Sequence, residues 1–316
     1  MILKRSLLWM IIGLLTSSAA AQSVSFTVTE TAGLRRFGYP VTASLECPRG
    51  SLLDAESVRL TDANRQEFPA QFTVMSNWPD GTVRGLDVDL APSMGPSETQ
   101  TYHVELGQRP TRPARTGLSV TETVDELLVA SAAIQHRIRR DGNPLLNSIA
   151  FGDTEFIGVD GIRTSSVPGT VEVVKRGPFN VTLKLGPVRL EYVHTKSWVK
   201  ITQVAPEPRE LMVDAHFQLT ELPLLWDFGV GSWLYGTLKK SDEAVTLRYL
   251  DSQWIVSTGQ PATPFALAKS FDGCGHLADG RKVAAFGIFP ASQDVKTELN
   301  GNGQLRITAK RNELVT

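Results

Sequence analysis

The chain has 316 residues, 41% of them hydrophobic, and its 32 basic side chains nearly balance 33 acidic ones. A chain of this length can bury a large core and favours two domains over one. The near-neutral charge, without a long basic run, argues against nucleic acid as a partner.

Residues 1–21 have the three-part pattern of a secretory signal peptide. Lys4 and Arg5 form a short basic start, residues 7–15 are nearly all apolar, and residues 16–21 are small and end in three alanines. Cleavage is expected before Gln22, which leaves 295 residues with 30 basic and 33 acidic side chains, a formal charge of −3. We therefore expect an exported protein, periplasmic or extracellular. No later apolar stretch is long enough to span a membrane, so we expect no membrane span.

Glycine and proline interrupt the rest of the chain at short intervals, and alternation of period two dominates between them. This pattern predicts strands over 25–29, 41–45, 57–60, 68–75, 83–90 and 101–106, and later over 170–175, 179–185, 188–195, 198–204, 211–219, 244–249, 253–257, 265–270, 282–289 and 305–309. Residues 124–138 fit either a helix or a strand, and the turn sequence DGNP that follows favours a strand. The chain is predicted to be all-β, with a small N-terminal barrel followed by a larger antiparallel sandwich.

The stretch GQRPTRPARTG at 107–117 has the composition of an exposed linker. We therefore place the first domain at 22–107, the linker at 108–117 and the second domain at 118–316. Within the first domain, NWPDGTVRGLDVDL at 77–90 predicts a tight turn followed by a half-buried strand. Trp78 at this turn is a packing residue or a sugar-stacking platform; we favour packing, with Arg84 reaching Asp80.

Several motifs resemble the exo-rhamnogalacturonan lyase-like family. In the first domain these are GYPV at 38–41, PRGSL at 48–52, VRLTDANRQEFPAQFTV at 58–74 and the turn just described. In the second they are VEVVKRGPFNVTLKL, VHTKSWVKITQV, LMVDAHFQL and CGHLADGRKVAAFGIFP. The resemblance implies an N-terminal RIFT-type barrel and a central β-sandwich. The chain ends at Thr316, where the family's C-terminal α/α toroid would begin, so we expect either a two-domain relative that lacks the toroid or a truncated gene product.

A lyase that acts on a uronate must neutralise the carboxylate, remove the adjacent proton and release the leaving oxygen. Asp214 and His216 are the best candidates for this chemistry, because alternation in LMVDAHFQL places both on the polar face of one strand. There the carboxylate could orient and charge the imidazole. The alternative is an ordinary solvated outer face.

A second pair of candidates lies in EYVHT at 191–195. Tyr192 and His194 share the parity of neighbouring apolar residues, so they are either core residues or part of a concave, sugar-binding sheet face. In the second case Tyr192 would stack on a sugar or donate a proton, and Lys196 and Trp198 would extend the surface. His276 lies in a predicted loop, as a stabiliser of the turn or as part of a site with Asp279 and Arg281.

The segment LLWDFGVGSWLYG at 224–236 is rich in aromatic residues and glycine. Trp226, Trp233 and Tyr235 are candidates for contact with a saccharide, although the segment would equally serve to cover an open sheet edge. Arg281 is a further candidate for substrate binding.

The sequence contains none of the common hydrolase, nucleotide-binding or zinc-protease motifs. It indicates no cofactor and leaves a divalent cation such as calcium open. Export would permit a disulfide between Cys47 and Cys274, but their wide separation leaves pairing open. The expected function is processing of a pectin-type polysaccharide by β-elimination. The alternative, favoured by the missing toroid, is a carbohydrate-binding or accessory envelope protein without turnover.

Overall fold

The computed structural model describes residues 22–112, 114, 116–131, 134–166, 169–230, 233–259 and 263–316, without the side chains of 233 and 265. Within these residues nearly every regular element is a strand, and one short 3-10 turn, η1 (Ala55–Ser57), is the exception. The prediction of an all-β chain is confirmed. Residues 1–21, the predicted signal peptide, lie outside the described residues.

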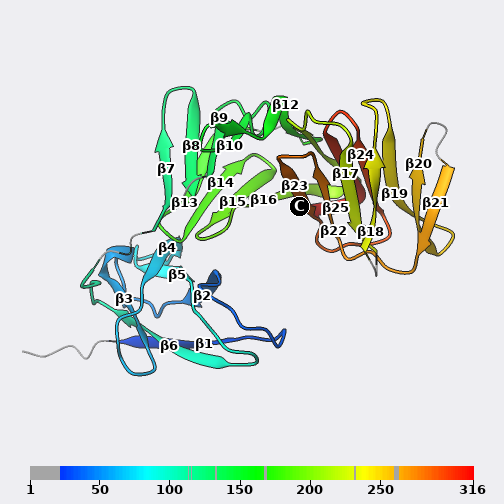
Figure 1. Cartoon of the computed structure of the whole chain (residues 1–316). Coiled ribbons are helices and arrows are strands. Elements are labelled where there is room, and N and C mark those ends of the chain that lie inside the picture. The colour runs from blue at the N-terminus through cyan, green and yellow to red at the C-terminus, as the bar shows by residue number, and fades with distance from the viewer. Residues whose placement is uncertain are drawn as a thin grey trace, which may run out of the picture.

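Residues 23–106, which we call the N-terminal unit, form two antiparallel sheets around one core (Figure 1). In spatial order, the strands of the first sheet are β1 (Ser23–Thr29), β6 (Thr99–Leu106) and β3 (Val58–Asp62), and those of the second are β2 (Val41–Glu46), β5 (Val83–Leu90) and β4 (Ala70–Asn77). Alternate residues of these strands, such as Leu60, Val88 and Val104, fill the space between the sheets. The result is a small, barrel-like β structure.

Residues 118–316, the C-terminal unit, form a larger sandwich with its own core. One layer is a long sheet, whose strands in spatial order are β13 (Val171–Arg176), β14 (Asn180–Leu185), β15 (Val188–Val193), β16 (Lys200–Phe217), β25 (Gln304–Val315), β24 (Val295–Asn300), β19 (Ala244–Leu250), β20 (Gln253–Thr258) and β21 (Thr263–Ala268). An additional strand, β12 (Ile157–Thr164), pairs with the end of β16.

Two smaller sheets make the second layer of this sandwich (Figure 1). The first has the spatial order β11 (Thr154–Glu155), β10 (Ser148–Phe151), β9 (Ile134–Arg139), β8 (Glu126–Ser131) and β7 (Leu118–Glu122). The second has the order β18 (Trp233–Leu238), β17 (Leu224–Gly229), β22 (Cys274–Ala278) and β23 (Val283–Gly287). Between them lies an apolar cavity of about 830 Å³, which we call the sheet cleft.

The long strand β16 shows how alternation builds the sandwich. In its second half Leu211, Val213 and Ala215 are buried, whereas Asp214 and His216 are partly exposed. The predicted assignment of the two faces is therefore confirmed. The structure differs in joining the predicted strands 198–204 and 211–219 into one element, because β25 pairs with both halves across an irregularity between Val204 and Arg209.

In segment 224–236, predicted to contact a saccharide or to cover an open sheet edge, the described residues form a strand pair, β17 and β18. Glycine makes this pairing possible, because a side chain at Gly236 would collide with the ring of Trp226. The glycine and the aromatic ring therefore serve packing between the two strands, and Trp226 lies in the core at 3% exposure.

Candidate functional site

The two units meet where β5 of the first lies against β13 and β14 of the second (Figure 1). The Gln71 side chain bridges this junction. Its Oε1 accepts hydrogen bonds from the backbone N–H groups of Phe179 and Asn180 at 2.9 and 2.8 Å, and its Nε2 donates to the Asn180 carbonyl at 2.9 Å. Any side chain at Gly177 would overlap Gln71, which explains the glycine in this strand connection.

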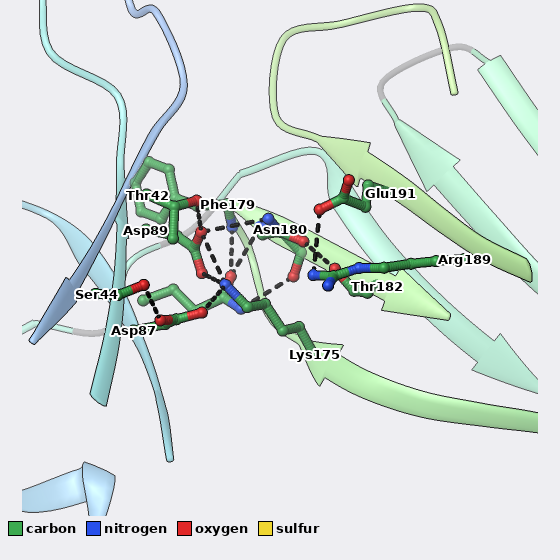
Figure 2. A network of polar contacts seen from close by, with 11 residues as sticks. Thr42, Ser44, Asp87, Asp89, Lys175, Phe179, Asn180, Thr182, Arg189 and Glu191 are labelled. Atoms are coloured by element: carbon green, nitrogen blue, oxygen red, sulfur yellow. Dashed lines mark hydrogen bonds and ion pairs between the residues drawn. The ribbon is translucent and has the colours of Figure 1, made fainter. Parts of the chain in front are cut away.

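A buried ion cluster completes the junction (Figure 2). Lys175 Nζ lies 2.8 Å from Asp87 Oδ2 and 3.1 Å from Asp89 Oδ2, and its side chain is only 2% exposed. Neighbouring hydroxyls on β2 complete the carboxylate shell, since Ser44 donates to Asp87 at 2.6 Å and Thr42 to Asp89 at 2.5 Å. Charges can be buried in this way because each is paired and hydrogen-bonded. The cluster holds β5 against β13.

A groove of about 180 Å³ opens beside this cluster, between the two units. The N-terminal unit contributes residues 39–42, 89 and 90, and the C-terminal unit contributes Phe179, Asn180, Glu191, Val193, Trp198 and Lys200. Two aromatic rings on the groove are accessible, Tyr39 at 43% and Trp198 at 49% exposure. The volume is below the ~300–1,000 Å³ of pockets that enclose a drug-sized ligand, so the groove suits one unit of a longer molecule.

Cations surround the groove. Arg36 and Lys196 both lie over the Tyr39 ring, at 4.8 and 5.0 Å from its centroid. On the opposite wall Glu191 is held between Arg189, at 3.2 Å, and Lys200, at 2.5 Å. Arg36 also pairs with Glu30 at 3.4 Å, and Lys175 with Asp87 and Asp89. Five cations therefore face four carboxylates here, and the net positive charge that remains favours an anionic ligand.

Groups of these kinds can contact an acidic sugar. Exposed rings stack on the apolar faces of sugars, amides such as that of Asn180 hydrogen-bond to hydroxyls, and lysine pairs with carboxylates. His194 lies next to the groove, with its ring 5.7 Å from that of Phe179. Partial burial lowers the pKa of His194, which keeps its imidazole neutral and able to accept a proton near neutral pH.

The predicted pair Asp214 and His216 lies elsewhere, on the outer face of the long sheet, and each side chain has other partners. Asp214 accepts hydrogen bonds from Arg306 at 2.6 Å and Gln304 at 2.8 Å. His216 Nε2 lies 3.0 Å from the carbonyl of Asn302, and its Nδ1 lies 3.6 Å from Asp160. The carboxylate that faces His216 is therefore Asp160, and Asp214 serves a cross-strand ion pair.

Two other predicted site residues are core residues. Tyr192 is 1% exposed, packs against His136 with ring centroids 4.9 Å apart, and has its hydroxyl pKa raised by burial. Trp226 packs against Phe228 at 5.6 Å between ring centroids. Both face inward by alternation along their strands, so neither presents its ring to a ligand.

The remaining candidates lie on the sheet made by β17, β18, β22 and β23, in the other half of the C-terminal unit (Figure 1). Tyr235 is 76% exposed, and Arg281 forms an ion pair with Glu221 at 2.7 Å. His276 is on strand β22, not in the predicted loop, with Nδ1 2.8 Å from Asp227 Oδ1. The side chain of Trp233 lies outside the described residues.

Sequence reasoning missed the groove and its ion cluster. Two features of the sequence pointed to the cluster. Acidic and apolar residues alternate in LDVDL at 86–90, and a lysine, Lys175, lies in VEVVKRG at 171–177; both segments are in strands expected to bury one face. Their pairing across the two units is visible only in three dimensions. At the turn after β4, Asp80 pairs with Arg49 at 2.6 Å, whereas Arg84, which was predicted to reach it, stacks on Trp78 at 4.8 Å.

Comparison with models of known protein families and with curated protein sequences finds no match. Among the described residues no group of three or more metal-binding side chains is found. Cys47 and Cys274 are both free thiols. In the part of the chain that the structure describes, no helix is long and apolar enough to cross a membrane.

Proposed function

We propose that this protein is exported and binds an acidic oligosaccharide, or the end of an acidic polysaccharide, in the groove between its two units. The observation that carries this proposal is the combination of two accessible rings, Tyr39 and Trp198, with a surrounding set of cations. Export follows from the signal-like residues 1–21, and the resemblance to exo-rhamnogalacturonan lyases favours a uronate of the pectin type.

Turnover is a second candidate function, and the position of His194 favours it. A β-elimination on a uronate needs a neutral base near the bound sugar and a cation near its carboxylate. His194 next to Phe179 and Lys200 in the groove are the residues we assign to these two roles. In this reaction His194 removes the proton beside the carboxylate, the C–H electron pair forms the double bond, and the C–O bond to the glycosidic oxygen breaks. The protonated His194 then returns its proton to that oxygen, which leaves as a hydroxyl group.

Binding is tested with oligogalacturonate and rhamnogalacturonan fragments by calorimetry. We expect binding to weaken at least tenfold in Trp198→Ala, because stacking on an exposed aromatic ring is lost. Tyr235→Ala is the matched control, since it removes an exposed ring from the other half of the C-terminal unit. Equal affinity in both variants, or no binding by the unaltered protein, would contradict the proposed site.

Turnover is tested separately by ultraviolet absorbance of the unsaturated uronate product. Growth of absorbance that is lost in His194→Ala but retained in His216→Ala supports the lyase. Binding without absorbance growth identifies a binding protein.

A further inference from the structure

The sheet cleft adjoins the proposed saccharide groove, and Trp198 and Lys200 line both. Its floor is the inner face of the long sheet, where β16 and β25 contribute Val213, Ala215, Phe217, Leu305 and Ile307. Its volume of about 830 Å³ lies within the ~300–1,000 Å³ typical of ligand sites. Exposed apolar side chains stand at its rim, including Phe151 at 55% and Phe289 at 61% exposure.

One wall of the cleft is the edge of a strand. Residues 283–287 all line the cleft. Successive side chains of a strand point to opposite faces of its sheet, so a strand that lines the cleft with every residue borders it with its edge. β23 is the terminal strand of its sheet among the described residues, with β22 on its other side. A free strand edge beside an apolar cavity offers both backbone hydrogen bonds and side-chain pockets.

The register of the β22–β23 hairpin identifies the free backbone groups. Asp279 N–H donates to the Lys282 carbonyl at 3.0 Å, and Ile288 N–H donates to the Gly273 carbonyl at 2.7 Å. Hydrogen-bonded pairs alternate along an antiparallel ladder, so Phe286 and Ala284 also bond to β22. The N–H and C=O groups of the residues between them therefore point into the cleft; these residues are Val283, Ala285 and Gly287.

The two ends of this edge are fixed to the rest of the sandwich. At one end Lys282 Nζ donates to the carbonyls of Glu155 and Gln218, at 2.7 and 3.0 Å. At the other, Phe289 N–H donates to the carbonyl of Val315 on β25 at 3.0 Å. Both anchors hold the edge open over the apolar floor.

We propose that the sheet cleft is a docking site for an extended peptide segment of a partner protein, which pairs with the free edge of β23. Alternate side chains of that segment are apolar and point onto the floor formed by β16 and β25. The backbone groups of β23 favour a peptide over an acyl chain, because an acyl chain would bury them without hydrogen bonds. Two further polar atoms of the cleft lining, His136 Nδ1 and Thr316 Oγ1, also have no hydrogen-bond partner among the described residues.

The probe is a displayed library of random nine-residue peptides, selected on the whole protein. We expect the enriched peptides to carry apolar residues at every second position. Ala285→Pro removes an outward N–H without breaking a bond to β22, and proline is tolerated on edge strands; it should weaken the selected peptides at least tenfold. Ala285→Ser, which keeps the N–H, is the matched control and should bind them as the unaltered protein does.

Residue-resolved hydrogen exchange on the unaltered protein gives a second measurement that needs no variant. Bound peptide should slow exchange at the amides of Ala285 and Gly287 and leave Ala284 and Phe286, already bonded to β22, nearly unchanged. The proposal is overturned if no peptide is enriched, if Ala285→Pro and Ala285→Ser bind equally, or if only dodecanoate, tested in parallel, occupies the cleft. Ala285 is not among the residues that line the groove, so neither variant should change saccharide binding. A negative result for the peptide therefore leaves the saccharide proposal standing.

Discussion

The junction between the two units and the sheet cleft both remove ionisable side chains from water, but they do so by opposite means. At the junction Lys175 forms ion pairs with Asp87 and Asp89, at 2.8 and 3.1 Å. In the cleft His136 is 1% exposed and, among the residues that the structure describes, no carboxylate pairs with it, so burial lowers its pKa to about 4. A charge is kept where partners surround it, and a titratable group is neutral where they do not.

The largest effect is expected at the junction. Lys175→Met should lower the free energy of unfolding by ~3–5 kcal/mol, because two buried carboxylates lose their cation. Lys200→Met is the control, since Lys200 pairs with Glu191 at a side-chain exposure of 44% and should cost about 1 kcal/mol or less. Urea unfolding measures both. Equal losses of unfolding free energy in the two variants would mean that the buried ion cluster contributes no more to stability than an exposed ion pair.

The second effect is a dependence of stability on pH that originates in the cleft. Because the folded pKa of His136 is about 4 and that of an unfolded histidine is ~6.5, the unfolded chain binds the proton more tightly. Stability from this residue is therefore complete above about pH 6.5 and is lost as the pH falls toward 4. The loss approaches ~3 kcal/mol, at ~1.4 kcal/mol per pKa unit.

The variant His136→Phe isolates this contribution, because it keeps an aromatic ring beside Tyr192 and cannot titrate. Between pH 7 and pH 4 the unaltered protein should lose about 3 kcal/mol more unfolding free energy than the variant. If the unfolding free energies of the two proteins fell in parallel over that range, the pKa of His136 would be the same in the folded and unfolded states, which would contradict the prediction.

The contrast also shows what sequence reasoning could reach. Alternation along LMVDAHFQL gave the inner and outer faces of β16 correctly, because burial of one face dictates residue choice at every second position. The same rule placed Asp214 and His216 on one face but could not say that β25 supplies Arg306 and Gln304 there. Pairings between strands distant in sequence decide which polar groups meet.

The groove could not be predicted from the sequence, because it depends on contacts between residues that are even farther apart in the chain. Its walls come from two units, and Tyr39 and Lys196 approach each other across 156 intervening residues. Local composition alone predicts that Lys196 and Trp198 extend a sugar-binding face. The aromatic segment around Trp226 was misleading, because the same residue types serve strand packing and ligand contact.

The smallest effect is expected on the outer face of β16, where the predicted site residues are already paired. Asp214→Asn should change unfolding free energy by about 1 kcal/mol or less, since Arg306, its partner, has a side-chain exposure of 45% and exposed pairs contribute little. Saccharide binding should not change, because Asp214 is not among the residues that line the groove. Calorimetry with the fragments used for Trp198→Ala checks this. A loss of affinity in Asp214→Asn that matched the loss in Trp198→Ala would move the binding surface from the junction of the two units to the outer face of the long sheet.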